Sequence, residues 1–121
     1  MKWVDTHCHL QLIDDTLDSE NFHNIEFLII PGVDFESSLK AKEISSEIDL
    51  ESYWSAGLHP HDAKLLNSQK KSLANLFQEA DLIGETGLDF YRNLSTKEEQ
   101  IENFLFHLEY SKLLYNPIII H

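Results

Sequence analysis

The sequence predicts an α/β fold of the (β/α) TIM-barrel type that is incomplete, with about five of the eight strand–helix units. Short apolar segments typical of buried strands alternate with segments that have the spacing of amphipathic helices. Polar residues follow directly after several of the strand segments, and active sites form at the carboxyl ends of parallel strands. A closed barrel typically needs ~250 residues, whereas this chain has 121.

The expected strands are short and apolar without strict alternation, as is typical of strands buried on both faces of a sheet. Because helical segments separate them, we expect the strands to run parallel. They are Lys2–Asp5, Glu26–Ile30, Tyr53–Gly57, Leu82–Glu85 and Pro117–Ile120.

Three of the intervening segments show the apolar spacing of a helix that packs against a sheet. The last and longest helix is expected to begin at a capping box made by Ser95 and Glu98. The apolar positions expected to face the sheet are Ala41, Ile44 and Ile48 in the first helix, Leu73, Leu76, Phe77 and Ala80 in the second, and Ile101, Phe104, Leu105 and Leu108 in the third.

Composition restricts the class of protein. We expect residues 1–121 to form one soluble domain, with no apolar stretch long enough to span a membrane and no secretory leader. A single cysteine makes no internal disulfide, which favours the cytoplasm. The chain has 21 acidic and 9 basic residues, a net charge of −12. A broad basic surface for nucleic acid is therefore excluded, and bound cations would have to attract a phosphate-bearing substrate locally.

Two histidines near the start of the chain indicate a metal site. They lie in the run Val4-Asp5-Thr6-His7-Cys8-His9. On a strand, His7 and His9 would point the same way, and Cys8 would pack behind them. Asp5 would share their face and orient a ligand as a hydrogen-bond acceptor. Two imidazoles at a strand end can hold one divalent metal ion.

Other strand ends carry similar polar motifs, which match a known family in order and spacing. The motifs are Asp5-Thr6-His7-Cys8-His9-Leu10, Gly57-Leu58-His59-Pro60-His61, Ile83-Gly84-Glu85-Thr86-Gly87-Leu88-Asp89-Phe90-Tyr91-Arg92, Gln100 with Phe104, and Pro117-Ile118-Ile119-Ile120-His121. Together they resemble the TatD family of metal-dependent deoxyribonucleases, within the amidohydrolase-like superfamily. The resemblance spans essentially the whole chain, which we interpret as the N-terminal portion of a TatD-like barrel.

The resemblance implies two-metal hydrolysis of DNA phosphodiester bonds, by an exonuclease that uses zinc, manganese or magnesium. His7 and His9 would hold the first metal ion. Glu85 would bridge both ions, because its two carboxylate oxygens can each take one, and His121 would belong to the second. Gly84 and Gly87 would let the backbone bend closely around Glu85. The family also uses a later histidine and a late aspartate that are not among these residues, and it commonly has glutamine in place of His107.

Three further residues are candidates for binding the substrate. His59 and His61 are expected to contact the substrate phosphate, although local packing or a helix-start contact is the alternative. Arg92 is a candidate phosphate clamp, because guanidinium pairs with phosphate oxygens in a bidentate way. An exposed loop arginine without a ligand is the alternative for that residue.

Two other functional readings stay open. A related hydrolase could cleave aminoacyl-tRNA esters. The chain could instead be a truncated barrel without activity of its own, whose first and last strands are open edges. Such a piece would pair with another copy or with a missing C-terminal portion.

Overall fold

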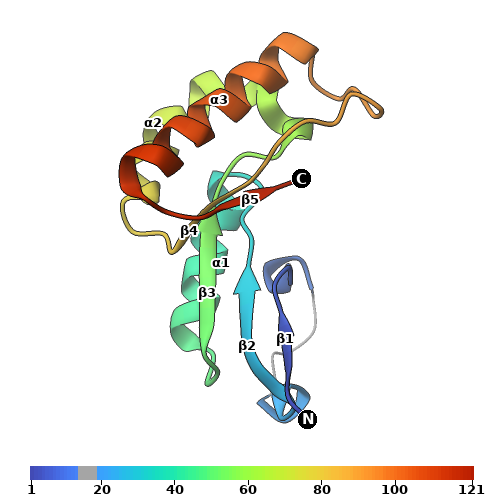
Figure 1. The fold of residues 1–121 in the computed structure, drawn as a ribbon, viewed down its shortest axis with the longest axis vertical. Helices are drawn as coiled ribbons and strands as arrows, with labels where there is room; N and C mark the ends of the chain where they lie inside the picture. The colour runs from blue at the N-terminus through green and yellow to red at the C-terminus, as the bar shows by residue number, and fades with distance from the viewer. Residues whose placement is uncertain (14–18) are drawn as a thin grey trace.

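Within the described residues, 1–13 and 19–121, the computed structural model has five parallel strands in the order β1-β2-β3-β4-β5 (Figure 1). Each strand therefore lies beside the next one in the chain, and the sheet curls into a half-barrel. The predicted incomplete (β/α)-barrel is confirmed. The strands are β1 Trp3–Asp5, β2 Ile25–Ile30, β3 Ser52–Ala56, β4 Leu82–Thr86 and β5 Ile118–Ile120.

The helices occupy the connections between strands, as parallel pairing requires. In Figure 1, α1 lies behind β3, while α2 and α3 lie together at the β5 end of the molecule. The helices are α1 Phe35–Glu47, α2 Leu66–Phe77 and α3 Lys97–Leu114, with short 3₁₀ turns η1 Leu10–Leu12, η2 Ser19–Phe22 and η3 Pro60–Leu65. Among the described helices, none combines the length and apolar composition needed to cross a bilayer.

The core forms where α1 and α2 pack on the sheet. The expected apolar faces of these two helices are confirmed, because Ala41, Leu73 and Phe77 are each fully buried. They meet the strand residues Leu28 and Ile83 in one contiguous cluster. Burial of this apolar surface stabilises the half-barrel.

The prediction for the third helix is wrong in its orientation. Ile101, Leu105 and Leu108 of α3 are 46%, 59% and 37% exposed. The inward side instead holds the polar residues Gln100, Asn103 and His107, each 0% exposed. Phe106, Tyr110 and Leu114 lie beside them and pack against the core. Backbone groups of neighbouring loops lie beneath α3, and polar side chains satisfy them better than apolar ones.

The start of α3 also differs from the prediction by one residue. Thr96, rather than Ser95, caps the helix, and its side chain accepts a hydrogen bond from the Glu99 N–H at 3.2 Å. The Glu99 carboxylate in turn accepts the Thr96 N–H at 2.8 Å. Ser95 is buried, and its hydroxyl bonds to the backbone of His61 and Lys64 in η3 instead, so it is not free to cap.

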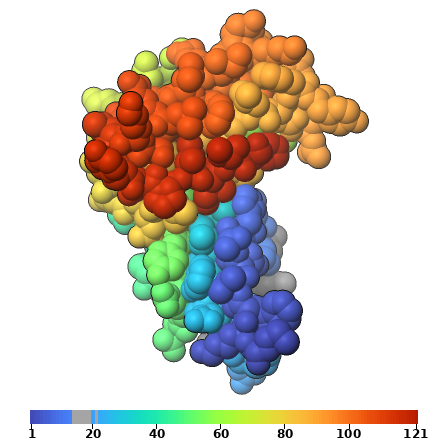
Figure 2. Space-filling model, viewed as in Figure 1, coloured from blue at the N-terminus to red at the C-terminus, as the bar shows by residue number. Residues whose placement is uncertain are grey.

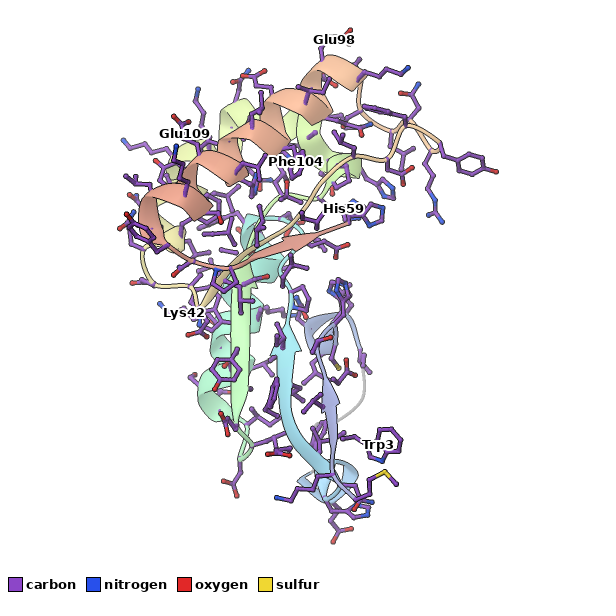
Figure 3. All side chains as sticks on the ribbon, in the orientation of Figure 1. Trp3, Lys42, His59, Glu98, Phe104 and Glu109 are labelled. Carbon is purple, nitrogen blue, oxygen red and sulfur yellow. The ribbon has the colours of Figure 1, made fainter. Side chains whose placement is uncertain are left out.

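β1 is not buried on both faces, which contradicts the expectation for that strand. Trp3 and Val4 are 61% and 50% exposed, and Figure 3 shows Trp3 projecting away from the sheet. Figure 2 shows β1 and β2, in blue and cyan, at the surface of this face, without a covering helix. In the part of the chain that the structure describes, β1 and β5 each pair with a single neighbour, so both edges of the sheet are open there.

Candidate metal centre

The carboxyl ends of four strands bring the predicted site residues to one place. His7 and His9 follow β1, His59 and His61 follow β3, Glu85 lies in β4, and His121 directly follows β5. All six side chains line one open hollow of about 800 Å³, together with Arg92 and Asp89. Figure 3 shows His59 beside the tip of β5.

The first group of donors consists of His7, His9 and Glu85. The His7 Nε2 atom lies 3.1 Å from both His9 Nε2 and Glu85 Oε2, and His9 Nε2 lies 3.3 Å from Glu85 Oε2. Donor atoms bound at 2.0–2.1 Å to a tetrahedral zinc ion are spaced roughly 3.3 Å apart. The three atoms therefore have the spacing that a metal ion requires.

The protonation pattern of His9 also fits a metal ligand. Its Nδ1 atom donates a hydrogen bond to the Pro31 carbonyl oxygen at 3.0 Å. A neutral ring with its proton on Nδ1 presents an unprotonated Nε2, which is the atom that faces His7 and Glu85. The backbone carbonyl thus fixes the tautomer that coordination needs.

The two rings meet for a different reason than strand alternation. β1 ends at Asp5, and His7 lies in a bend beyond it. The Asp5 carboxylate accepts the backbone N–H of His7 at 3.0 Å and so shapes this bend rather than orienting a ring. Cys8 is half-buried against the core. Burial, followed by the Asp5 charge, raises the pKa of its thiol.

Glu85 joins the first group to the other side of the hollow. Its Oε2 atom faces His7 and His9, while its Oε1 atom lies 3.0 Å from His121 Nδ1. The residue is only 4% exposed. Burial alone would raise its pKa, but the neighbouring His9 and His121, followed by the charges of His7 and His59, lower the pKa to about 2. Glu85 is therefore ionised at neutral pH, and its oxygens face two separate sets of nitrogen donors.

Two glycines allow the backbone to approach Glu85 closely, as expected. Gly84 has φ +120° and Gly87 has φ +145°. A Cβ atom at Gly84 would lie 2.5 Å from the Ile119 carbonyl oxygen, and one at Gly87 would lie 2.7 Å from that of His121. Both distances are too short for any side chain, so these positions need glycine.

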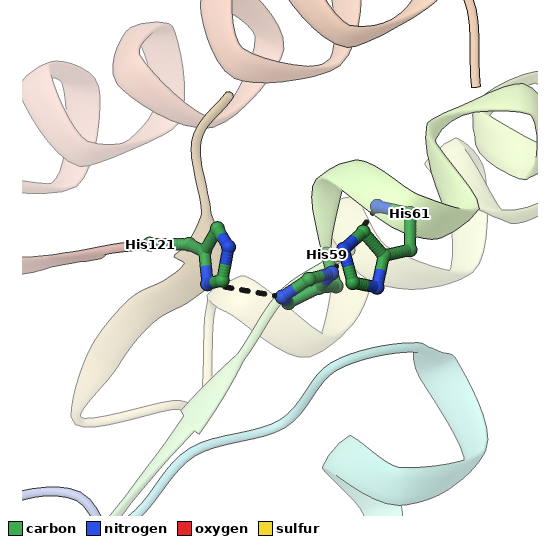
Figure 4. Close-up of side chains that lie close together, drawn as sticks. All are labelled: His59, His61 and His121. Carbon is green, nitrogen blue, oxygen red and sulfur yellow. Dashed lines mark hydrogen bonds between the residues drawn. The ribbon is translucent and has the colours of Figure 1, made fainter. Parts of the chain in front are cut away.

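His59, His61 and His121 form a second group on the far side of Glu85 (Figure 4). The His59 Nε2 and His121 Nδ1 atoms are 3.2 Å apart. Spacing alone would allow the three rings to hold a metal ion. The hydrogen bonds of His59 decide otherwise, because its Nδ1 atom accepts the His61 backbone N–H at 3.1 Å. The proton of a neutral ring must then lie on Nε2, which makes that atom a donor rather than a ligand.

Burial keeps His59 neutral. It lowers the pKa of the ring to about 4, although the nearby Glu85 charge opposes the shift. A fixed, uncharged N–H therefore points into the hollow beside the Glu85 carboxylate, 3.7 Å from its Oε1 atom. Such a group can donate to an anionic oxygen without repelling a metal ion.

Asp89 is a site residue that sequence reasoning missed. Its Oδ2 atom accepts a hydrogen bond from His61 Nε2 at 2.6 Å and lies 3.5 Å from His121 Nε2. The hydrogen bond from His61, followed by that from the Arg92 backbone N–H, lowers the Asp89 pKa to about 2. Its place in the same motif as Glu85, two residues after Gly87, was the available signal. Arg92 itself is exposed, with its side chain at the rim of the hollow.

The fold and the site together define a (β/α)-barrel-type chain with a histidine–carboxylate centre at its strand ends. Residues 4–121 match the family model described as TatD related DNase, and the chain belongs to this family.

Known relatives resemble the chain along most of its length. It is 29% identical over 133 residues to an uncharacterized metal-dependent hydrolase, YcfH, of Escherichia coli K12, covering 98% of this chain and 48% of that protein. It is 32% identical over 112 residues to the 3′-5′ ssDNA/RNA exonuclease TatD of the same organism, covering 89% of this chain and 42% of that protein. The chain thus spans about half the length of the curated relatives it matches.

A solved structure shows the same fold. The crystal structure of YJJV, a TatD homolog from Escherichia coli K12, superposes with a TM-score of 0.77 at 22% identity. The match covers 98% of this chain and 50% of that one.

Proposed function

We propose that this chain carries part of the active site of a nuclease that hydrolyses phosphodiester bonds at the ends of DNA, with two divalent metal ions. One observation carries the proposal. The two carboxylate oxygens of Glu85 face different histidines, His7 and His9 on one side and His121 on the other. A carboxylate shared in this way is suited to bridge two cations.

The ligands divide between the two ions. His7, His9 and Glu85 would hold the first, and the tautomer of His9 and the spacing of the three donor atoms fit that role. Glu85 and His121 would hold the second, completed by the late histidine and aspartate that the resemblance implies. When bound, such a pair of ions lowers the pKa of a coordinated water and stabilises charge on the phosphate oxygens. The imidazole and carboxylate donors admit zinc, manganese or magnesium.

The remaining residues would bind and orient the DNA end. The Nε2–H of His59 would donate to a phosphate oxygen, and Arg92 would supply a flexible positive charge at the rim of the hollow. His61 would support the same phosphate from its place beside Asp89. Asp5 would act indirectly, by holding the bend that places His7. Because the chain has a net charge of −12, these local groups and the metal ions would supply the attraction for DNA.

Nucleotide release from a labelled single-stranded oligonucleotide tests the proposal. We expect release with Mn²⁺ and none with EDTA. Glu85→Gln should abolish release, because the bridging carboxylate is lost. Glu79→Gln is the matched control, since Glu79 forms an exposed ion pair with Lys42 away from the site. Release that persists in Glu85→Gln would contradict the proposal.

If the chain releases no nucleotide, a specific alternative is favoured. The open edges at β1 and β5 suit a half-barrel that is inactive until another copy or a C-terminal portion covers them. Metal binding by the 14.1 kDa chain without nucleotide release would support that alternative, and light scattering would give the assembly state. Hydrolysis of charged tRNA but not of DNA would favour the aminoacyl ester reading.

A further inference from the structure

The inward side of α3 carries three fully buried polar side chains beside the apolar residues Phe106, Tyr110 and Leu114, which pack on the core. Gln100, Asn103 and His107 are spaced at i, i+3 and i+7 and are each 0% exposed. We call these three residues the polar seam. Within the described chain, the Asn103 Oδ1 atom has no hydrogen-bond partner, which is a cost that an apolar side chain would avoid. Polar residues retained at such a cost indicate a specific task.

Two members of the seam, Asn103 and His107, form hydrogen bonds with the backbone of Leu58, the residue directly before His59. The Asn103 Nδ2 atom donates to the Leu58 carbonyl oxygen at 2.7 Å. The Leu58 N–H donates to His107 Nε2 at 3.0 Å. The Leu58 side chain is also 0% exposed, so both polar backbone groups and the side chain are fixed. The backbone of His59 therefore starts from a fixed position and direction.

The His107 ring has the one tautomer that can serve as this anchor. Its Nδ1 atom donates to the Asn103 carbonyl oxygen at 2.7 Å, which leaves Nε2 as the acceptor for Leu58. Burial lowers the pKa of the ring to about 4. A glutamine at this position retains an acceptor, whereas a leucine does not.

Gln100, the third member of the seam, forms hydrogen bonds with the backbone of Asp89, on the loop after β4. The Gln100 Oε1 atom accepts the Asp89 N–H at 2.7 Å, and Nε2 donates to the Asp89 carbonyl oxygen at 3.2 Å. The Asp89 carboxylate then binds His61 Nε2 at 2.6 Å and lies 3.5 Å from His121 Nε2. Gln100 thus acts on both rings through one clamped residue.

We propose that the polar seam is a positioning device, which sets the directions of His59, His61 and His121 through the backbone of Leu58 and Asp89. This inference rests on the proposed function, because these rings matter as parts of the metal and phosphate site. It goes further by assigning the placement of the second histidine group to α3. His7 and His9, on the loop after β1, lie outside the reach of the seam.

Histidine ring signals measured by ¹⁵N NMR on the metal-free chain test this division of labour. His107→Leu should move the His59 ring signals and speed amide exchange of Leu58 at least ~10-fold, because the acceptor is lost. His107→Gln should restore both. Gln100→Met should move the signals of His61 and His121 while leaving Leu58 exchange near the wild-type rate. The signals of His7 and His9 should move least in every variant, because these rings contact the second group only through Glu85.

A substitution on the outer side of α3 serves as the matched control. Glu102→Leu places an apolar residue on the exposed side of the same helix and should move none of these signals. If His107→Leu does not fold, Gln100→Met and His107→Gln carry the test. The proposal would be overturned by variants that lose stability while the signals of all five site histidines move equally. It would also be overturned if none of these signals moves. The signals need no substrate, so a failure to cleave DNA would overturn the proposed function alone.

Discussion

His7 is held very differently from His59, which lies across Glu85. His7 lies on a bend after an exposed edge strand, and its side chain is 44% exposed. The side chain of His59 is only 12% exposed, on a loop that α3 anchors through two hydrogen bonds to Leu58. The first group has three donors with the spacing of a metal ion, but one of them, His7, has little support. The second has strong support but fewer unprotonated nitrogens.

The comparison separates two tasks that are often merged in one description of a metal site. A ligand set needs unprotonated donor atoms at the right spacing, and a bound ion itself holds flexible ligands in place. A substrate-binding group receives no such help, so its direction must be set by the protein before the substrate arrives. Rigid support for His59 and looser support for His7 fit that division.

Glu85→Gln should have the largest effect, because it breaks the connection between both groups. The amide presents one neutral oxygen where the carboxylate presents two charged ones, so metal affinity should fall more than the 10- to 100-fold typical of losing an outer partner. Metal content after dialysis, measured by elemental analysis, gives the result, with Glu79→Gln as the control. Unchanged stoichiometry would remove Glu85 from the site.

The pH dependence of stability tests whether the fold holds His107, which anchors Leu58 beside His59, in its neutral form. The pKa of His107 is about 4 in the folded chain and near 6.5 when unfolded. The unfolded state therefore binds the proton more readily, so the stability from the neutral ring is complete above pH 6.5 and is lost as the pH falls toward 4. The loss should reach about 3 kcal/mol, at 1.36 kcal/mol for each pKa unit.

Urea unfolding of the metal-free chain at several pH values measures this loss. His107→Gln does not titrate at this position, so the wild-type stability should fall relative to that variant between pH 6.5 and 4. Parallel curves for the two proteins would show that His107 is not held neutral by the fold.

His59→Gln should have the smallest effect on metal content and thereby test the distinction between ligand and donor. Because the His59 Nε2 atom carries the proton, the affinity for metal should change less than ~3-fold, below the 10- to 100-fold typical of losing an outer partner. Affinity for a single-stranded oligonucleotide should fall instead. Calorimetric titration with Zn²⁺ measures the first quantity. A loss of one bound ion per chain would make His59 a ligand.

Much of the fold followed from local patterns. The expected strands agree with β1 to β5 within one residue at each end. Buried strands are recognised by short apolar runs, and α1 and α2 by their apolar spacing. The same spacing failed for α3, where Ile101 and Leu105 face outward. Apolar periodicity alone misplaced the inward side of α3, because buried polar residues that bond to loop backbone interrupt it. Phe106, Tyr110 and Leu114 of the same helix still pack against the core.

The chain sequence by itself determined which residue types stand at the strand ends, because parallel strands deliver their carboxyl termini to one edge. It therefore placed His7, His9, Glu85 and His121 together. Only the tertiary structure decided which nitrogen of each ring is free. That choice depends on carbonyl and amide groups from distant segments, such as Pro31 beside His9. No local pattern encodes these contacts, since they exist only once the chain has folded.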